Sequence, residues 1–133
     1  MLIDAGLELL SESDAMRLLA AGDVGRVGIT VAGLPAIFPV NYGLVDGHIV
    51  FRTAPGSKLA AAARGAVIAF EVDDYDRADR SGWSVLAIGP SEVVHDLEIT
   101  FKILDAAIEP FAGGVRTSIV RIRPELLTGR RIV

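Results

Sequence analysis

The sequence contains no cysteine, and His48 and His95 are its only histidines among 133 residues. The absence of cysteine excludes disulfide bonds, thiolate metal sites and thiol nucleophiles. Two separate histidines form a poor metal site, so we predict no metal and a structural role for each. The sequence also lacks a Gly-x-Ser-x-Gly elbow, a phosphate loop ending in Gly-Lys-Ser or Gly-Lys-Thr, and a dinucleotide-binding glycine fingerprint. Any catalysis would therefore depend on an organic cofactor.

Clusters of positive charge and long apolar runs are missing as well. The formal net charge is −4, and no basic patch is interleaved with aromatic residues. Nucleic acid is therefore not expected as a partner. No apolar run approaches the roughly 20 residues that span a bilayer. The first residues include Asp4, where a signal peptide has basic residues. We expect a soluble cytoplasmic protein that does not act at a membrane.

Aliphatic residues are abundant. Hydrophobic residues make up 51% of the chain and charged residues 23%, which is typical of a globular protein, and the length suits a single domain over residues 1–133. Aromatic residues account for only 6%, so valine, isoleucine, leucine and alanine must fill the core. The mean hydropathy of +0.46 is high for a small monomer. We expect part of the apolar surface to lie in a subunit interface.

Strand patterns dominate the chain. Three helices are expected: one from the capping residue Ser11 to Gly22, one over residues 56–64, and one from the capping residue Asp96 toward Pro110. The remaining segments read as about six or seven strands, mostly joined by hairpins. This arrangement predicts a mainly β fold, a small closed antiparallel barrel with helices over its openings.

Four aspartates lie in the stretch 73–82, which raises the possibility of a metal-binding loop. Their spacing lacks the glycine and the distal glutamate of a calcium loop, and two arginines lie among them. A solvated loop with internal ion pairs is therefore expected there.

The segment from Pro39 to Lys58 has the pattern of a binding site. Asp46-Gly47 predicts a tight hairpin turn between two extended runs. The second run ends in two cations and two hydroxyls, a set suited to a phosphate group: Arg52, Thr53, Ser57 and Lys58. The expected helix start at residues 57–58 adds unpaired N–H groups. In the alternative interpretation, Ser57 caps the helix and Lys58 is solvated.

Some residues have roles that spacing does not decide. Trp83, the only tryptophan, follows a polar loop at the start of a strand, so it fits either the core or a surface facing a ligand or partner subunit. The roles of four arginines stay open between solvent, ion pair and bound anion: Arg26, Arg121, Arg123 and Arg130.

Several segments together resemble one known family. They are Pro39-Val40-Asn41-Tyr42, the run Phe51–Lys58, the run Phe70–Asp74, and Gly82-Trp83-Ser84-Val85-Leu86. In this order and spacing they resemble the pyridoxamine 5′-phosphate oxidase-like flavin-binding proteins, which are Greek-key-like split β-barrels. The resemblance extends from about Ser11 to about Val94, with weaker support from 121–124 and 128–131.

The resemblance implies a homodimer with flavin mononucleotide, FMN, bound at two sites between the subunits. By position, Arg52, Thr53, Ser57 and Lys58 would hold the phosphate and ribityl chain. Pro39, Val40, Asn41 and Tyr42 would line the ring, partly through main-chain groups. Trp83 would approach from the other subunit.

The same resemblance leaves the activity open. Pyridoxamine 5′-phosphate oxidation itself is not expected, because no second phosphate cluster is found. A flavin-dependent oxidoreductase that passes hydride to or from a small-molecule electron donor or acceptor needs no protein nucleophile and is the first hypothesis. The alternatives are a reductase or binding protein for the deazaflavin F420, a non-catalytic flavin or haem carrier or sensor, and a purely structural dimer.

Overall fold

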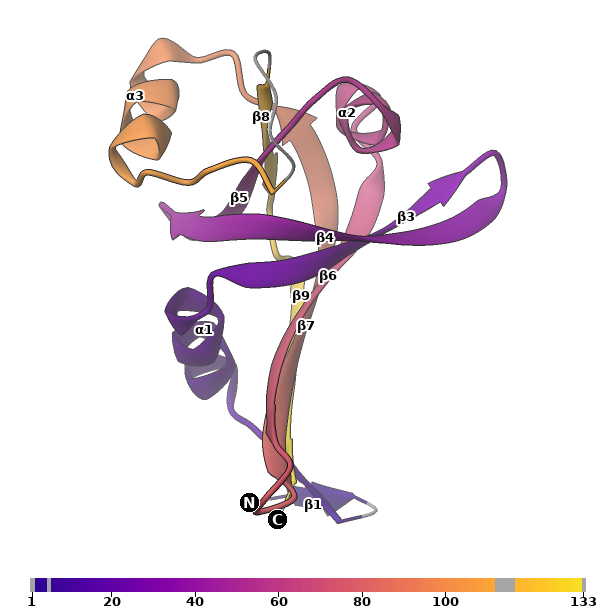
Figure 1. Ribbon diagram of the computed structural model, residues 1–133, viewed down its shortest axis with the longest axis vertical. Helices are drawn as coiled ribbons and strands as arrows, with labels where there is room; N and C mark the ends of the chain where they lie inside the picture. The colour runs from indigo at the N-terminus through magenta and orange to yellow at the C-terminus, as the bar shows by residue number, and fades with distance from the viewer. Residues whose placement is uncertain (1, 5, 112–116, 133) are drawn as a thin grey trace.

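The computed structural model describes residues 2–4, 6–111 and 117–132. Figure 1 shows their arrangement. The helices are α1 (Glu12–Ala21), α2 (Ser57–Ala63) and α3 (Leu97–Asp105). The strands are β1 (Leu2–Asp4), β2 (Leu7–Leu9), β3 (Val24–Val31), β4 (Leu34–Val45), β5 (His48–Thr53), β6 (Val67–Asp76), β7 (Ser81–Val93), β8 (Ser118–Ile122) and β9 (Leu126–Ile132).

The strands form one antiparallel sheet that closes on itself. Its order is β1-β2-β9-β7-β6-β3-β4-β5-β8, and a further pairing joins β7 to β8. Six strands, β3, β4, β5, β8, β7 and β6, therefore make a closed barrel, as predicted. Strands β9, β2 and β1 extend the sheet downward as a stem beside the lower half of β7 (Figure 1). The sequence reading missed β1 and β2, because runs of three residues are too short for an alternating pattern.

The aspartate-rich stretch is mostly strand, which corrects the expected loop. Strand β6 continues through Asp76, with Asp73 paired to Ser84 and Asp76 to Ser81. Only residues 77–80 form a turn, which Asp76 stabilises by accepting hydrogen bonds from the backbone N–H groups of residues 78 and 79. Within the described part of the chain, Asp73 pairs with Arg26 and not with an arginine of its own stretch. Cross-strand pairing explains the difference, because it places Asp73 beside β3.

The three predicted helices are present. The Ser11 hydroxyl accepts a hydrogen bond from Asp14 N–H at 3.1 Å, and the Asp96 carboxylate accepts one from Ile99 N–H at 3.1 Å. Helix α2 begins after Gly56 without a side-chain cap. Helix α1 packs beside the stem, whereas α2 and α3 lie at the opposite end of the barrel (Figure 1). In the described residues, no helix is both long enough and apolar enough to cross a bilayer.

The barrel interior holds the main core. Its largest fully buried side chains include Phe51, Phe70, Leu19 and Ile49. A smaller cluster of Val50, Ile103 and Ile108 attaches α3 to the outside of β5. Aliphatic residues supply most of both clusters, as the low aromatic content predicts.

Candidate functional site

One cavity collects most of the residues that the sequence analysis selected. It has a volume of about 330 Å³. Its walls come from β4, the end of β5, the loop into α2 and the segment after α3: Phe38, Pro39, Val40, Arg52, Thr53, Ala54, Pro55, Gly56, Ser57, Lys58, Pro110 and Phe111. Arg52 and Lys58 are the charged residues in this lining, and both are cationic. A cavity whose described lining residues include no carboxylate, in a protein of net charge −4, favours an anionic ligand.

The β4–β5 hairpin brings two walls of the cavity together, the one from β4 and the one from the end of β5. Asp46 and Gly47 both adopt positive φ, at 50° and 76°, as in the predicted tight turn. The pairing of Tyr42 with Phe51 then places the end of β5 beside Pro39 and Val40. The loop through Gly56 has open space where a side chain at that residue would lie, so its backbone is accessible.

Lys58 is the cation that is available to a ligand. Its Nζ lies 4.6 Å from the centroid of the Phe38 ring, a cation–π contact. Among the described residues it forms no hydrogen bond or ion pair that would hold the ammonium elsewhere. Helix α2 has only seven residues, so its N-terminus adds little to the field of the ammonium.

Arg52 is already partly engaged inside the protein. Its Nε and Nη2 donate to Thr117 Oγ1 at 3.2 and 2.8 Å, and its Nη1 lies 3.4 Å from the carbonyl oxygen of Ile108. A guanidinium has five N–H groups, so two remain for a ligand. Arg52 therefore holds the end of the α3 segment and the start of β8 in place while it forms part of the cavity wall.

The other predicted residues in the cavity lining are Pro39, Val40, Thr53 and Ser57, and they mainly form its walls. Val40 is buried in the core, and Pro39 is exposed on the outer face of β4. Thr53 is buried, and its hydroxyl donates to the carbonyl oxygen of Ala54 at 3.2 Å. Ser57 is half-buried at the start of α2.

The structure places Tyr42 and Asn41 away from this cavity lining. The Tyr42 side chain lies in the core, and its hydroxyl donates to the carbonyl oxygen of Leu19 at 2.6 Å. Burial, and secondarily the charge of Asp23, raises the pKa of Tyr42 to about 12. Asn41 is half-buried on β4, paired with Val24 of β3. The side chain of Tyr42 thus attaches α1 to the barrel.

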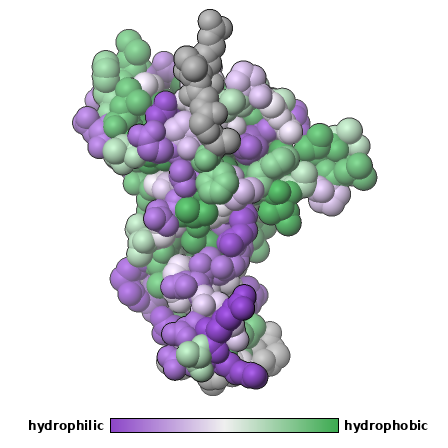
Figure 2. Space-filling view, viewed as in Figure 1, coloured by the Kyte–Doolittle hydropathy of each residue, from purple (hydrophilic) through white to green (hydrophobic). Residues whose placement is uncertain are grey.

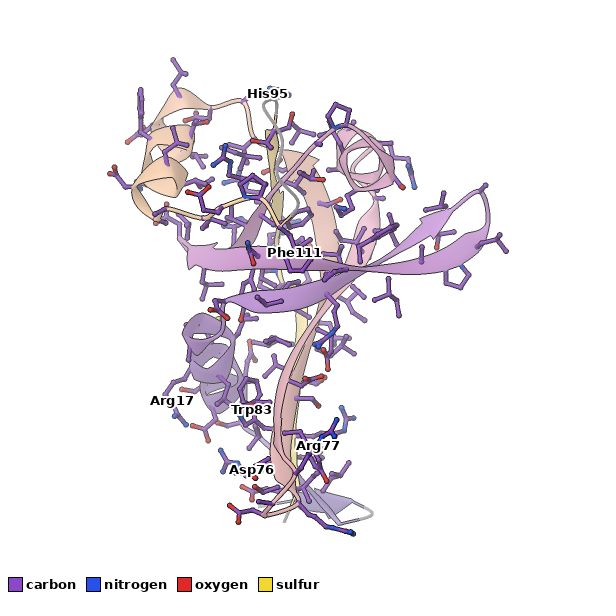
Figure 3. All side chains as sticks on the ribbon, viewed as in Figure 1. Arg17, Asp76, Arg77, Trp83, His95 and Phe111 are labelled. Atoms are coloured by element: carbon purple, nitrogen blue, oxygen red, sulfur yellow. The ribbon has the colours of Figure 1, made fainter. Side chains whose placement is uncertain are left out.

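Trp83 lies in the stem, at the end of the fold opposite to the cavity of Lys58. Figure 3 shows it in the stem beside α1, whereas Phe111 lies at the level of β4. Trp83 packs against the main core and lines a separate hollow of about 310 Å³ together with Asp74, Tyr75 and Arg130. Within one chain, Trp83 does not reach the cavity of Lys58.

Arg121 and Arg123, two of the arginines whose roles the sequence leaves open, are held in ion pairs. Arg121 pairs with Glu92, and Arg123 pairs with Glu125 at 2.7 Å. Together with His48 they line a hollow of about 290 Å³ whose cations are thus balanced by carboxylates. The described residues contain no group of three or more histidine, aspartate or glutamate side chains placed to hold a metal ion.

Sequence reasoning missed several cavity residues. Phe38 directly precedes the selected segment. Because Phe38 and Val40 are two positions apart on one strand, their side chains point to the same face, and this spacing could have indicated that Phe38 belongs to the cavity. Pro110, Phe111 and Thr117 join the site from more than 50 positions along the chain, through the Arg52 contacts and the pairing of β5 with β8. No local pattern in the sequence indicates this proximity.

Comparisons with known proteins identify the family and the fold of this chain. The family model described as pyridoxamine 5′-phosphate oxidase matches residues 11–131. The uncharacterised protein Rv0080 of Mycobacterium tuberculosis is 42% identical over 129 residues, which cover 93% of this chain and 84% of that protein. The solved FAD binding protein from Mycobacterium smegmatis is 34% identical, with 95% of this chain and 100% of that chain covered and a TM-score of 0.80. A FAD-binding protein from Mesorhizobium loti is 25% identical. The match covers 96% of this chain and 99% of that chain, with a TM-score of 0.78.

Proposed function

The chain belongs to the pyridoxamine 5′-phosphate oxidase family, and we propose that it binds a flavin nucleotide in the cavity of Lys58 and takes part in redox chemistry. The observation that carries the proposal is the composition of that cavity. Its lining combines two cations and the hydroxyl of Ser57 with the apolar surfaces of Phe38, Pro110 and Phe111. A flavin combines the matching groups, a flat aromatic ring system and an anionic phosphate.

Each part of the cavity has a role in this proposal. Lys58 and Ser57 bind the ribityl phosphate, and the two remaining N–H groups of Arg52 support it. The open backbone at Gly56 lets the phosphate approach the main chain. Phe38, Pro39 and Phe111 exclude water from the ring. The flavin supplies hydride transfer, so the protein needs no nucleophile of its own.

The form of the flavin is part of the proposal. The sequence resemblance implies FMN, whereas the similar structures from Mycobacterium smegmatis and Mesorhizobium loti are FAD-binding proteins by name. FAD contains the whole of FMN, so the same ribityl phosphate contacts serve both. The mass of the released cofactor decides between them, and it also distinguishes both from F420.

We place this function in a homodimer. Trp83 and Arg130 line a hollow in the stem, distant from the cavity of the same chain (Figure 3). A second copy that brought its stem to this cavity would add an aromatic ring and a cation to the flavin site. The activity that we propose is oxidoreduction with a small-molecule electron donor or acceptor, and not pyridoxamine 5′-phosphate oxidation.

The first experiment combines the visible absorption spectrum of the purified chain with the mass of whatever a denaturant releases. We expect a two-band flavin spectrum, or reconstitution of that spectrum when the apoprotein is titrated with FMN or FAD. A chain that binds neither flavin would contradict the proposal.

Substitution of Lys58 tests the phosphate site. Lys58→Ala should weaken flavin binding about 10- to 100-fold, because one charge-assisted contact contributes about 1.5 to 3 kcal/mol. Fluorescence titration of the apoprotein measures the change. The matched control is Lys102→Ala, which removes a lysine that pairs with Asp46 at 3.0 Å outside the cavity. Equal flavin affinity in the Lys58 variant and the parent would place the phosphate elsewhere.

A further inference from the structure

A second hollow lies on the outside of the barrel, over β5, β8 and β7. Its volume is about 290 Å³. The described residues that line it are His48, Pro90, Ser91, Glu92, Arg121 and Arg123. None of them lines the flavin cavity, so the second hollow is a separate feature of the surface.

Two arginines give the second hollow its charge. Ile122 is fully buried in the core, so the residues on either side of it, Arg121 and Arg123, face outward from the barrel. A strand rises about 3.3 Å per residue, so these two side chains leave the backbone about 7 Å apart along one face. The described lining contains one carboxylate, that of Glu92, against two guanidinium groups. The second hollow therefore has an excess of positive charge in a protein of net charge −4.

His48 lies beside Arg123. Ile49 of β5 pairs with Ile122 of β8, and the continuation of this register brings His48 next to Arg123. His48 Nδ1 is 3.1 Å from the carbonyl oxygen of Asp46. Because a carbonyl oxygen only accepts hydrogen bonds, Nδ1 carries the proton in this contact, and Nε2 remains for a ligand.

The ion pairs of the two arginines orient them and leave most of their N–H groups for a ligand. Arg121 donates to Glu92 through Nε. Arg123 donates to Glu125 through Nε and Nη2, at 3.2 and 2.7 Å. A guanidinium has five N–H groups, so beyond these contacts four remain on Arg121 and three on Arg123. Glu125 is not among the lining residues, so it positions Arg123 from outside the second hollow.

We propose that the second hollow binds a small phosphate monoester that also carries hydroxyl groups, as a sugar phosphate does. A phosphate monoester has three terminal oxygens, enough to accept hydrogen bonds from both guanidinium groups, whereas a carboxylate has two. The Glu92 carboxylate and His48 Nε2 accept hydrogen bonds from the hydroxyl groups of the ligand. The volume lies at the lower end of the range of ligand pockets, roughly 300 to 1,000 Å³, which favours a small ligand over a dinucleotide.

Helix α3 separates the second hollow from the flavin cavity. Along the outer face of β5, His48 lines the second hollow, Val50 is covered by Ile103 of α3, and Arg52 lines the flavin cavity. The chain thus offers two places for a phosphate group, and the inference does not rest on the proposed function.

Proton NMR of the histidine rings tests the inference at constant pH, on the full chain saturated with FMN or FAD so that the flavin cavity is filled. His48 and His95 are the only histidines, and His95 is not among the lining residues, so one protein contains both a reporter and a control. Titration with ribose 5-phosphate should shift the ring resonances of His48 along a saturable curve and leave those of His95 in place. His48→Gln assigns the resonances. Inorganic phosphate should bind about tenfold more weakly, because it lacks the hydroxyl groups of the sugar.

Substitution of Arg123 tests the location of the phosphate. Arg123→Ala should weaken the binding of ribose 5-phosphate about 10- to 100-fold, because it removes one charge-assisted contact. The matched control is Arg17→Ala. The Arg17 and Arg123 side chains are 67% and 64% exposed, and each pairs with a nearby carboxylate, at 3.0 and 2.7 Å. Arg17→Ala should bind ribose 5-phosphate as the parent does, and circular dichroism of both variants should match the parent.

The two glutamates test the ligand class. Glu125→Gln should tighten the binding of inorganic phosphate and of ribose 5-phosphate, because it removes a negative charge beside Arg123 without touching the ligand. Glu92→Gln should reduce the preference for ribose 5-phosphate over inorganic phosphate about fivefold, because a neutral acceptor binds hydroxyl groups less strongly than a carboxylate does. Titration calorimetry of both ligands measures the two affinities.

Four results would overturn the inference. They are the absence of a saturable shift at His48, an equal shift at His95, equal affinities of Arg123→Ala and the parent, and equal affinities for ribose 5-phosphate and inorganic phosphate. Binding that appears only when flavin is removed would place ribose 5-phosphate in the flavin cavity and overturn the inference as well. A chain that takes up no flavin is titrated as purified, and the expected shift of His48 would then support the second hollow while the proposed flavin site fails.

Discussion

At the scale of single residues, Arg52 and Lys58 carry the same charge and have different roles. The planar guanidinium of Arg52 holds Thr117 and the carbonyl group of Ile108 through three hydrogen bonds. The ammonium of Lys58 rests on the Phe38 ring. Among the described residues, removal of Lys58 therefore loses only the contact with Phe38, while removal of Arg52 also releases the segment that forms one wall of the cavity.

Tyr42 allows a residue-scale prediction. Tyr42→Phe removes the partner of the Leu19 carbonyl group near the C-terminal end of α1. A buried carbonyl group without a partner costs about 1 to 3 kcal/mol, so the free energy of unfolding should fall by about that amount. Urea denaturation followed by circular dichroism measures this loss.

The control for this variant is Tyr75→Phe, since Tyr75 is 53% exposed. Its stability should equal that of the parent. Flavin affinity should be unchanged in Tyr42→Phe, because the Tyr42 side chain lies in the core. A stable Tyr42→Phe variant with weakened flavin binding would contradict the structural role and favour the ring contact that the family resemblance implies.

At the scale of elements, the barrel depends on a change of partner along β7. Its residues 83–88 pair with β9, and its residues 91–93 pair with β8. Between these two regions the connection from β8 to β9 crosses β7, where Arg123 N–H donates to the carbonyl oxygen of Pro90 and Glu125 N–H donates to that of Ile88, both at 3.1 Å. Gly89 lies under this crossing.

Gly89→Ala should disrupt the crossing. A methyl group there would lie 1.6 Å from the carbonyl oxygen of Arg123, a backbone atom that cannot move away without breaking the crossing. The expected loss in the free energy of unfolding is about 3 kcal/mol or more. Chemical denaturation tests this expectation, and an unfolding midpoint equal to that of the parent would show that the crossing tolerates displacement.

At the scale of the whole molecule, the two ends of the fold carry different groups of residues. The barrel end contains the cavity, and the stem contains Trp83 and the aspartate-rich strand (Figure 3). The stem surface is largely hydrophilic in Figure 2. In the proposed homodimer, the stem of one copy and the barrel of the other form the flavin site together.

Binding of flavin should stabilise the whole molecule. A ligand that binds only the folded state adds about 2.7 kcal/mol at a concentration about a hundredfold above its dissociation constant. The thermal unfolding midpoint should therefore rise by several degrees when FMN or FAD is added. Scanning calorimetry of the parent and of Lys58→Ala at the same flavin concentration should show a smaller rise for the variant. Equal shifts in both proteins would mean that the stabilising flavin does not contact Lys58.

Local patterns predicted much of the fold. The caps Ser11 and Asp96, the turn at Asp46-Gly47 and the closed β-barrel are confirmed. The patterns placed Arg52, Thr53, Ser57 and Lys58 in one cluster because these residues are neighbours in the chain. Patterns failed for β1, β2 and the end of β6, where short length or charged composition hides a strand whose stability comes from its partners.

The sequence by itself determined the element types, the turns and the cationic loop from Arg52 to Lys58, since each of these depends on a few consecutive residues. Only the tertiary structure decided that Arg52 holds Thr117, that Tyr42 faces the core, and that Arg26, Glu71 and Asp73 share one hollow. The physical reason is that the strand register sets these contacts. Register results from packing of the whole sheet, so a local pattern in the chain does not contain it.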